Sequence, residues 1–332
     1  MIAPADYHNV RTWLARCRRP LLVTHRRPDG DALGAVAGMS LALQALQLDP
    51  RPVLYEPLPA RYAQMTDAVA WRRWDQERVQ LIAEGDALVI LDTCSFAQLD
   101  PLVGYLSQAP RTLVIDHHPT RDALGTRPGD LCLFDESAGA VCLLVAEWIQ
   151  TIGLPLTPAL ATPLFIGLAT DCGWFRFSNT DARVLRTAAD LLEAGTPAAA
   201  IYRAIYEQDP PARLRLIARM LQTLELQADG KLVVMTLRQA DFAAAGADRS
   251  MTEDLVNEAA RLAGIEATLL FTEESDGSVR VNFRSKQTLD VAQLAARFGG
   301  GGHARASGAR PKGSWEEVVP RVIGDTIAAL SV

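Results

Sequence analysis

The chain has 332 residues, enough for about two ordinary domains that each bury a core. Hydrophobic residues make up 49% and charged residues 22%, which is typical of a globular protein and excludes a disordered or low-complexity chain. The formal net charge of −6 argues against a protein that coats long nucleic acid, because such proteins usually carry a basic field. Any nucleic-acid substrate should therefore be short, or be held by metal ions and a local basic pocket, and long duplexes are not expected partners.

The sequence contains no targeting or membrane signal. Its longest apolar runs are far shorter than the roughly 20 residues that a bilayer span needs, and the first turns carry charged residues instead of a signal-peptide core. The five cysteines form no C-x-x-C pair and have no regular spacing, so neither a disulfide framework nor a thiolate zinc site is predicted. We expect a cytoplasmic protein with no membrane partner, and the oligomeric state stays open.

Strands and helices alternate in the first half of the chain. This alternation favours an α/β domain whose sheet is mainly parallel and flanked by helices. Asp31 is the predicted N-cap of the helix that follows the first strand. The predicted strands are 20–25, 52–55, 87–91 and 112–115, and the predicted helices are 5–17, 32–46, 140–150 and 158–169.

The second half of the chain begins with helical periodicity over 182–226, broken at two Gly- or Pro-containing turns. The pattern after this helical segment predicts a smaller α+β unit with a hairpin turn at Asp276-Gly277. Its predicted strands are 232–237, 266–273 and 278–285, its predicted helices are 252–263, 290–297 and 315–330, and a glycine loop lies at 299–302. We expect a catalytic domain over 1–194, a helical linker over 195–228 and a substrate-binding domain over 229–332.

Polar side chains gather where the predicted strands end. His25, Asp92 and Asp116 each fall at the carboxyl end of a predicted strand, which is where open α/β sheets place their ligands. Carboxylates and imidazoles without thiolates suit Mn²⁺, Mg²⁺, Co²⁺ or Fe²⁺ better than structural zinc. The candidate residues are His25, Asp29, Asp31, Asp92, Asp116, His117, His118 and Asp171.

So many carboxylates in one crevice would repel one another strongly unless cations neutralised them. A cluster of two divalent ions is the simplest interpretation. Such a cluster activates a bridging water to a hydroxide, which attacks phosphorus in line, and a protonated imidazole then protonates the departing oxygen.

These residues resemble, in order, the four motifs of the DHH phosphoesterase superfamily. The motifs are 24–34, Leu91-Asp92-Thr93, Asp116-His117-His118 and Thr170-Asp171, and the segments 284–286 and 299–308 resemble the DHH-associated C-terminal domain. The resemblance covers nearly the whole chain. Its two-domain form is most similar to the subgroup of nanoRNases, or oligoribonucleases, and 3′-phosphoadenosine 5′-phosphate (pAp) phosphatases.

The resemblance implies two divalent ions, with Mn²⁺ preferred and Mg²⁺ or Co²⁺ as alternatives. It implies that the first metal is held by His25, Asp29 and Asp92, and the second by Asp31, Asp92, His117 and Asp171. His118 would then lie beyond the metals, near the leaving group. Asp116 would orient an imidazole by a hydrogen bond without binding a metal itself.

The resemblance also implies that the C-terminal domain binds the substrate's nucleotide and terminal phosphate. Arginine is a forked phosphate donor, and glycines with exposed N–H groups can form an anion nest. The implied residues are Arg284, Ser285, Gly300, Gly301, Gly302 and His303.

The sequence departs from the subgroup at Cys172 and at Ala140-Val141-Cys142, where more polar residues are usual. We expect neither departure to touch a metal ligand.

Hydrolysis of short RNA to mononucleotides, together with dephosphorylation of pAp to AMP, is the leading interpretation. A phosphodiesterase for cyclic di-AMP or linear pApA and an inorganic pyrophosphatase are alternatives from the same superfamily. A catalytically silent nucleotide-binding module is the alternative from another class, and it would be expected to have a damaged ligand set.

Overall fold

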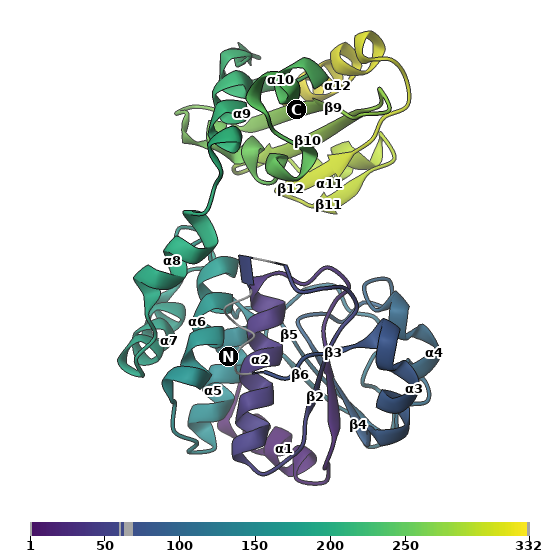
Figure 1. The fold of residues 1–332 in the computed structure, drawn as a ribbon, viewed down its shortest axis with the longest axis vertical. Coiled ribbons are helices and arrows are strands. Elements are labelled where there is room, and N and C mark those ends of the chain that lie inside the picture. The colour runs from purple at the N-terminus through teal and green to yellow at the C-terminus, as the bar shows by residue number, and fades with distance from the viewer. Residues whose placement is uncertain (1, 60, 63–68, 331–332) are drawn as a thin grey trace. The chain divides into compact units, whose positions relative to one another are not determined.

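The computed structural model describes residues 2–59, 61–62 and 69–330. The chain divides into two compact units, Met1–Glu207 and Gln208–Val332, each built on one six-stranded sheet (Figure 1). The predicted fold class is therefore confirmed, whereas the finer division into 1–194, 195–228 and 229–332 stays a prediction. Among the described residues, no helix combines the length and hydrophobicity that a membrane span requires.

The sheet of the first unit is parallel throughout its described pairs, with the strand order β3-β2-β1-β4-β5-β6. The three central strands β1, β4 and β5 are direct neighbours, so their carboxyl ends lie side by side. Its strands are β1 Pro20–Val23, β2 Arg51–Leu54, β3 Arg72–Arg73, β4 Ala87–Leu91, β5 Thr112–Asp116 and β6 Leu131–Phe134.

Helices cover both faces of this sheet, because the central strands are apolar on both sides. On β1, Leu22 faces one core while Leu21 and Val23 face the other. The first core packs against α1, α2, α5, α6 and α7, and the second against α3 and the short α4 (Figure 1). The helices are α1 Pro4–Leu14, α2 Gly30–Ala45, α3 Trp74–Glu84, η2 Asp100–Leu102, α4 Val103–Leu106, α5 Val141–Thr151, α6 Pro158–Asp171, α7 Ala182–Glu193 and α8 Ala198–Tyr206.

Helices α2 and α6 pack unusually closely, and glycines make this approach possible. A Cβ added at Gly34 would lie 2.4 Å from the carbonyl oxygen of Pro163, and one at Gly30 would lie 2.2 Å from Oγ1 of Thr170. Atoms other than hydrogen do not approach so closely, so a side chain at either position would force its neighbour on α6 to shift. The close packing brings the start of α2 against the end of α6, and these two ends carry Asp31 and Asp171.

Several local predictions about the first unit are wrong. The N-cap of α2 is Asp29, whose Oδ1 accepts hydrogen bonds from the N–H groups of Asp31 and Ala32, so Asp31 lies in the first turn instead. The first strand ends at Val23, two residues before His25. Strand β6 and helix α3 were not predicted.

The second unit has a mixed sheet of order β11-β12-β10-β9-β8-β7, in which β8 runs parallel to β9. Strands β9 and β10 form the predicted hairpin, with Gly277 at φ 79° in its turn. Helices α11 and α12 pack on one face, and α9, α10 and η4 on the other. The strands are β7 Glu225–Gln227, β8 Leu232–Leu237, β9 Ala267–Glu273, β10 Val279–Ser285, β11 Gly301–His303 and β12 Ala306–Ala309, and the helices are α9 Pro211–Gln222, α10 Gln239–Ala245, η3 Arg249–Thr252, η4 Leu255–Arg261, α11 Val291–Ala296 and α12 Trp315–Leu330.

Two predictions for this unit are also wrong. The segment 252–263, predicted to be an α-helix, contains the end of η3 and all of η4, both of which are 3-10 helices. The predicted glycine loop continues into a strand, because Gly301 and Gly302 pair with Gly308 and Ser307 of β12.

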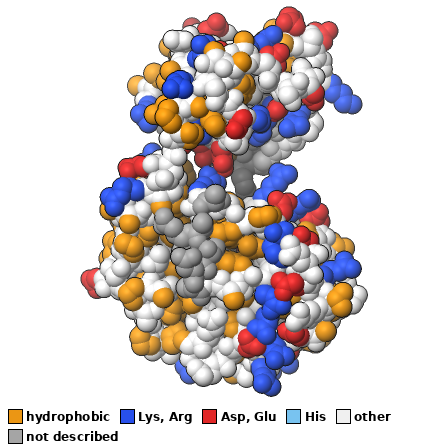
Figure 2. All heavy atoms as spheres, viewed as in Figure 1, with side chains coloured by type: hydrophobic (Ala, Val, Ile, Leu, Met, Phe, Trp, Pro, Cys, Tyr) orange, Lys and Arg blue, Asp and Glu red, His pale blue; other side chains and the backbone are white. Residues whose placement is uncertain are grey.

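Charges of both signs are interspersed on the face of the molecule in Figure 2, which agrees with the absence of a basic field in the sequence. In the first unit, one ion cluster is largely removed from water. Arg183 of α7 donates from Nη1 to Oδ2 of Asp135 at 2.7 Å and from Nη2 to Oε2 of Glu147 at 2.6 Å. The guanidinium therefore joins α7 to α5 and to the segment after β6.

Replacing this cation should destabilise the first unit. In Arg183→Met the aliphatic length is kept, but Asp135 and Glu147 lose their shared partner, and breaking a buried ion pair costs about 3 kcal/mol. Urea unfolding followed by circular dichroism measures the loss. Arg186→Met, at an exposed position of the same helix, is the matched control, and equal stability of the two variants would contradict the assigned role.

Candidate functional site

Asp92 lies at the centre of the predicted residues in the first unit. It follows β4, and its two carboxylate oxygens face imidazoles that follow the neighbouring strands β1 and β5. Oδ2 is 3.6 Å from Nε2 of His25, and Oδ1 is 3.7 Å from Nε2 of His117. These distances are longer than hydrogen bonds and leave room for a cation to be shared between the ligand atoms.

Three groups of ligand atoms form around this carboxylate, and within each group the atoms lie within 4.8 Å of one another. Asp92 belongs to two of the groups and His117 to two. The groups are Asp92 with His117 and His118; His25 with Asp29 and Asp92; and Asp31 with His117 and Asp171. All eight sequence-predicted residues of this unit are thus brought together, since Asp116 contacts His118 directly.

The backbone of Asp92 adopts a conformation that is uncommon for a residue with a side chain. Its φ is 63°, in the left-handed region, although its N–H still donates to the carbonyl of Ile115 at 3.0 Å. Such strain is tolerated where the surroundings hold a residue in place, and it is common at functional sites. Asp92 as a residue is 3% exposed, and its Oδ1 accepts no hydrogen bond from the described residues.

The electrostatics of the site are unfavourable without a cation. Burial, and then the charges of Asp31, Asp29 and Asp171, raise the pKa of Asp92 well above its ordinary value. Burial and the charges of Asp31 and Asp29 likewise raise the pKa of Asp171 to about 8. A set of carboxylates and imidazoles that converges on the buried carboxylate of Asp92 fits divalent cations, which prefer these oxygen and nitrogen ligands.

Asp31 is held by the start of α5. Its Oδ2 accepts the N–H of Val141 at 2.6 Å and its Oδ1 accepts the N–H of Cys142 at 2.9 Å, so it caps a helix whose own N-cap, Ala140, offers no side-chain acceptor. The thiol of Cys142 also donates to the Asp31 carbonyl at 3.4 Å. The expectation that the departure at 140–142 touches no predicted ligand is therefore wrong, because two backbone N–H groups and the Cys142 thiol contact Asp31.

The two histidines of the third motif are held in different ways. Nδ1 of His117 is 2.9 Å from the carbonyl oxygen of Ala138, which can only accept, so Nδ1 carries the proton and Nε2 is left as a ligand atom. Nδ1 of His118 is 2.8 Å from Oδ1 of Asp116, and this hydrogen bond raises the pKa of His118. Asp116 is fully buried, and its Oδ1 also accepts the N–H of His117.

In the second unit, Arg284 and Ser285 lie at the end of β10. Nε of Arg284 donates to Oδ1 of Asn257 at 2.9 Å, and its Nη2 is 3.9 Å from Oδ1 of Asp254. Burial lowers the pKa of the Arg284 guanidinium. The Ser285 hydroxyl donates to the carbonyl of Leu289 at 2.6 Å.

The glycine run 299–302 was predicted to expose its N–H groups, and the structure differs from this prediction. The N–H groups of Gly299 and Gly300 donate to the carbonyls of Ala296 and Ala295, so an anion nest that uses them is excluded. A Cβ at Gly300 would lie 2.1 Å from the Gly308 carbonyl, which gives this glycine a packing role. Gly301 and Gly302 lie on the edge strand β11 together with His303.

Sequence reasoning missed the partners that are backbone groups. The carbonyl of Ala138 and the N–H groups of Val141 and Cys142 orient His117 and Asp31, but any residue type provides such groups. The turn after α6 was also missed. Its residues Trp174 and Phe175 both have positive φ, and a non-glycine pair of this kind leaves no sequence signal.

Neutralising Asp92 should stabilise the protein when divalent ions are removed. Asn has nearly the same shape and tolerates a left-handed backbone, while it removes a buried charge that Asp29, Asp31 and Asp171 repel. With a chelator present, the melting temperature of Asp92→Asn should exceed that of the unmodified protein by about 4 °C, or about 1–2 kcal/mol. Addition of Mn²⁺ should raise the melting temperature of the unmodified protein more than that of the variant.

The matched control is Asp75→Asn, which removes an exposed carboxylate in the same unit. A variant at Asp92 that melts no higher than the control in chelator would contradict the repulsion that we infer.

Two family models match the chain. The DHH family, N-terminal domain, matches residues 20–168, and the DHHA1 domain matches residues 229–330. A bifunctional oligoribonuclease and PAP phosphatase NrnA from Thermus thermophilus is 31% identical over 296 residues, 88% of this chain and 84% of the relative. The protein of the same description from Bacillus subtilis is 29% identical and is covered over 92% of both chains.

A solved structure has the same fold. The exopolyphosphatase-related protein from Bacteroides fragilis superposes with a TM-score of 0.89 over 99% of this chain and 97% of its own, at 23% sequence identity. The resemblance that the motifs indicated is confirmed by these matches. The chain therefore belongs to the DHH family of phosphoesterases, in the two-domain form that carries a DHHA1 domain after the DHH domain, and it is a hydrolase.

Proposed function

We propose that the protein hydrolyses short oligoribonucleotides to mononucleotides and pAp to AMP, using two divalent ions of which Mn²⁺ is preferred. The observation that carries this proposal is the buried carboxylate of Asp92 between the imidazoles of His25 and His117, with further carboxylates around it. An intact ligand set of this kind argues against a catalytically silent module.

The proposed ligands divide into two sets that share Asp92. His25, Asp29 and Asp92 would hold one ion, and Asp31, Asp92, His117 and Asp171 would hold the other. Two of the three ligand groups found in the structure support this division. When bound, such ions supply Lewis acidity and the positive charge that offsets phosphoryl oxygens.

The remaining groups of the site orient the proposed ligands or protonate the leaving group. Asp116 accepts a hydrogen bond from Nδ1 of His118 and thereby favours the doubly protonated imidazole. The proton on Nε2 of His118 is then available to the departing oxygen of the phosphoester. The N–H groups at the start of α5 fix both carboxylate oxygens of Asp31, so that its orientation does not depend on the ligand.

The substrate class is supported by the relatives. Both relatives described above are named as bifunctional oligoribonucleases and PAP phosphatases, and the match extends over most of their length. We therefore prefer short RNA and pAp to the cyclic or linear dinucleotides of the alternative hypothesis. Arg284, Ser285, Gly301, Gly302 and His303 would bind the nucleotide and terminal phosphate.

A substrate panel tests this proposal directly. The purified chain with Mn²⁺ should release mononucleotides from RNA of two to five nucleotides and phosphate from pAp, and a chelator should abolish both reactions. Chromatography of the products, with cyclic di-AMP, linear pApA and pyrophosphate as competing substrates, provides the measurement. Rapid cleavage of long single strands while dinucleotides stay intact would contradict the proposal.

Removing the guanidinium of Arg284 should weaken binding more than turnover. A phosphate contact made equally in the ground and transition states lowers KM without changing kcat, so Arg284→Ala should raise KM about tenfold at similar kcat. Steady-state kinetics with pAp measures both constants. Arg261→Ala, which removes an arginine that is 84% exposed on the same unit, is the control. Unchanged kinetics in Arg284→Ala would exclude this arginine from the binding site.

A further inference from the structure

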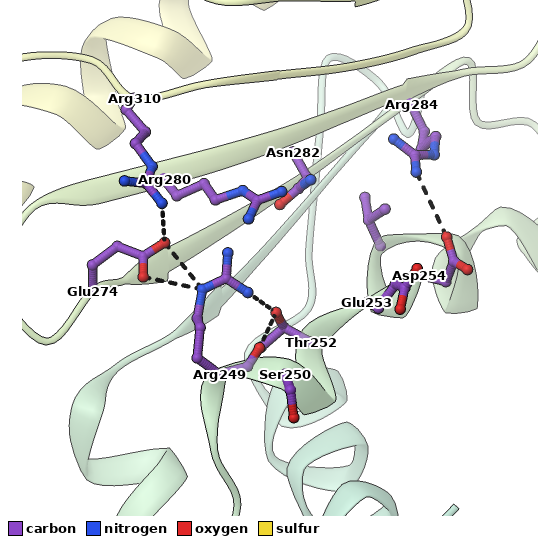
Figure 3. A pocket seen from close by; sticks show the side chains of 11 residues that line it. Arg249, Ser250, Thr252, Glu253, Asp254, Glu274, Arg280, Asn282, Arg284 and Arg310 are labelled. Atoms are coloured by element: carbon purple, nitrogen blue, oxygen red, sulfur yellow. Dashed lines mark hydrogen bonds and ion pairs between the residues drawn. The ribbon is translucent and has the colours of Figure 1, made fainter. Parts of the chain in front are cut away.

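The second unit contains a polar pocket of about 730 Å³, of which the proposed function uses only Arg284. Arg284 lies at one end of it and Glu274 at the other (Figure 3). Four arginines line it together with three carboxylates, in a chain whose net charge is −6. The charged residues are Arg249, Arg280, Arg284, Arg310, Glu253, Asp254 and Glu274.

The floor of the pocket is one face of β10. Because side chains alternate along a strand, Arg280, Asn282 and Arg284 share this face, while Val281 and Phe283 are buried in the core on the other. The three polar side chains form a row about 13 Å long from Arg280 to Arg284. A polar row of this length can follow the backbone of a single strand past more than one phosphate.

The end of the row opposite Arg284 concentrates positive charge around a single carboxylate. Glu274 is 13% exposed and accepts hydrogen bonds from Nε of Arg249 at 3.0 Å, while Nη2 of Arg310 is 3.6 Å from its Oε1 (Figure 3). Val281 pairs with Ala309 in the sheet, which makes Arg280 and Arg310 cross-strand neighbours. Two like charges at such positions repel each other, and an additional anion between them would be favourable.

At the other end, Arg284 is only weakly compensated. Its side chain is 27% exposed, and the nearest carboxylate oxygen that pairs with it, Oδ1 of Asp254, is 3.9 Å away. Its Nε and Nη1 donate to neutral acceptors, the Asn257 side chain and the Phe283 carbonyl. Nη2 is therefore available to a phosphate, the group that arginine binds best.

We propose that this pocket binds the backbone phosphates of the second and later nucleotides of an oligoribonucleotide. The inference rests on the proposed function, because it takes Arg284 as the contact to the first nucleotide and extends the site from there along β10. Arg280, Arg310 and Asn282 then set the preference for oligonucleotides over pAp, which has no further nucleotide to place in the pocket.

Selective kinetics test the pocket. In Arg280→Ala and in Arg310→Ala, KM for an RNA pentanucleotide should rise about tenfold, the equivalent of one charge-assisted hydrogen bond, while KM for pAp changes less than twofold. The dependence of log KM on log salt for the pentanucleotide should decrease by about 0.7 for each phosphate that no longer pairs with an arginine. Arg310 is 66% exposed, so its replacement leaves the fold intact, and Arg261→Ala controls for a general decrease in positive charge.

Equal losses for pAp and pentanucleotide, or no loss for the pentanucleotide, would overturn the inference. Failure of the proposed function gives a different result, because the unmodified protein would then turn over neither substrate. In that case, fluorescence anisotropy of a labelled RNA pentanucleotide in chelator still tests the pocket. Weaker binding by Arg280→Ala than by Arg261→Ala supports the inference, and equal binding overturns it.

Discussion

The site of the first unit is built around the buried carboxylate of Asp92, whose negative charge is unfavourable there without a cation. Asp92 has a left-handed backbone, is almost completely buried and is flanked by Asp29, Asp31 and Asp171, whose charges raise its pKa. Within the described part of the chain, His25 and His117 are its nearest imidazoles, and neither is within hydrogen-bonding distance. A fold that maintains such repulsion stores free energy that divalent cations release on binding, and this couples the stability of the unit to its proposed chemistry.

The rest of the unit holds these charges in place without neutralising them. Three neighbouring parallel strands deliver His25, Asp92 and Asp116 to one edge of the sheet. The glycine-mediated packing of α2 on α6 adds Asp31 and Asp171, and the start of α5 fixes the orientation of Asp31 through backbone N–H groups. Hydrogen bonds from amides stabilise a carboxylate while leaving its charge intact, so the site stays attractive to cations.

The sheet and the convergence of polar residues at its edge could be predicted from the sequence, because the pattern of side chains determines both. Apolar runs followed by acids or histidines indicated the parallel sheet and the convergence at its carboxyl edge, and all eight predicted residues of the first unit meet there. The predictions from the sequence failed where contacts of the backbone determine the arrangement. Asp29 instead of Asp31 caps α2, Cys142 contacts Asp31 through its amide, and Gly300 is required by close packing to Gly308. The apolar spacing of 252–263 suits an α-helix and a 3-10 helix alike, so periodicity alone could not separate them.

The stoichiometry of metal binding tests the central claim most directly. Titration of the chelator-treated chain with Mn²⁺, followed by the electron paramagnetic resonance signal of free Mn²⁺, counts the ions bound per chain. If Asp92 is shared between two metal sites as proposed, the unmodified protein should bind two ions, and Asp92→Asn should bind both more weakly. Binding of two ions with undiminished affinity by Asp92→Asn, or no binding by the unmodified protein, would contradict the account.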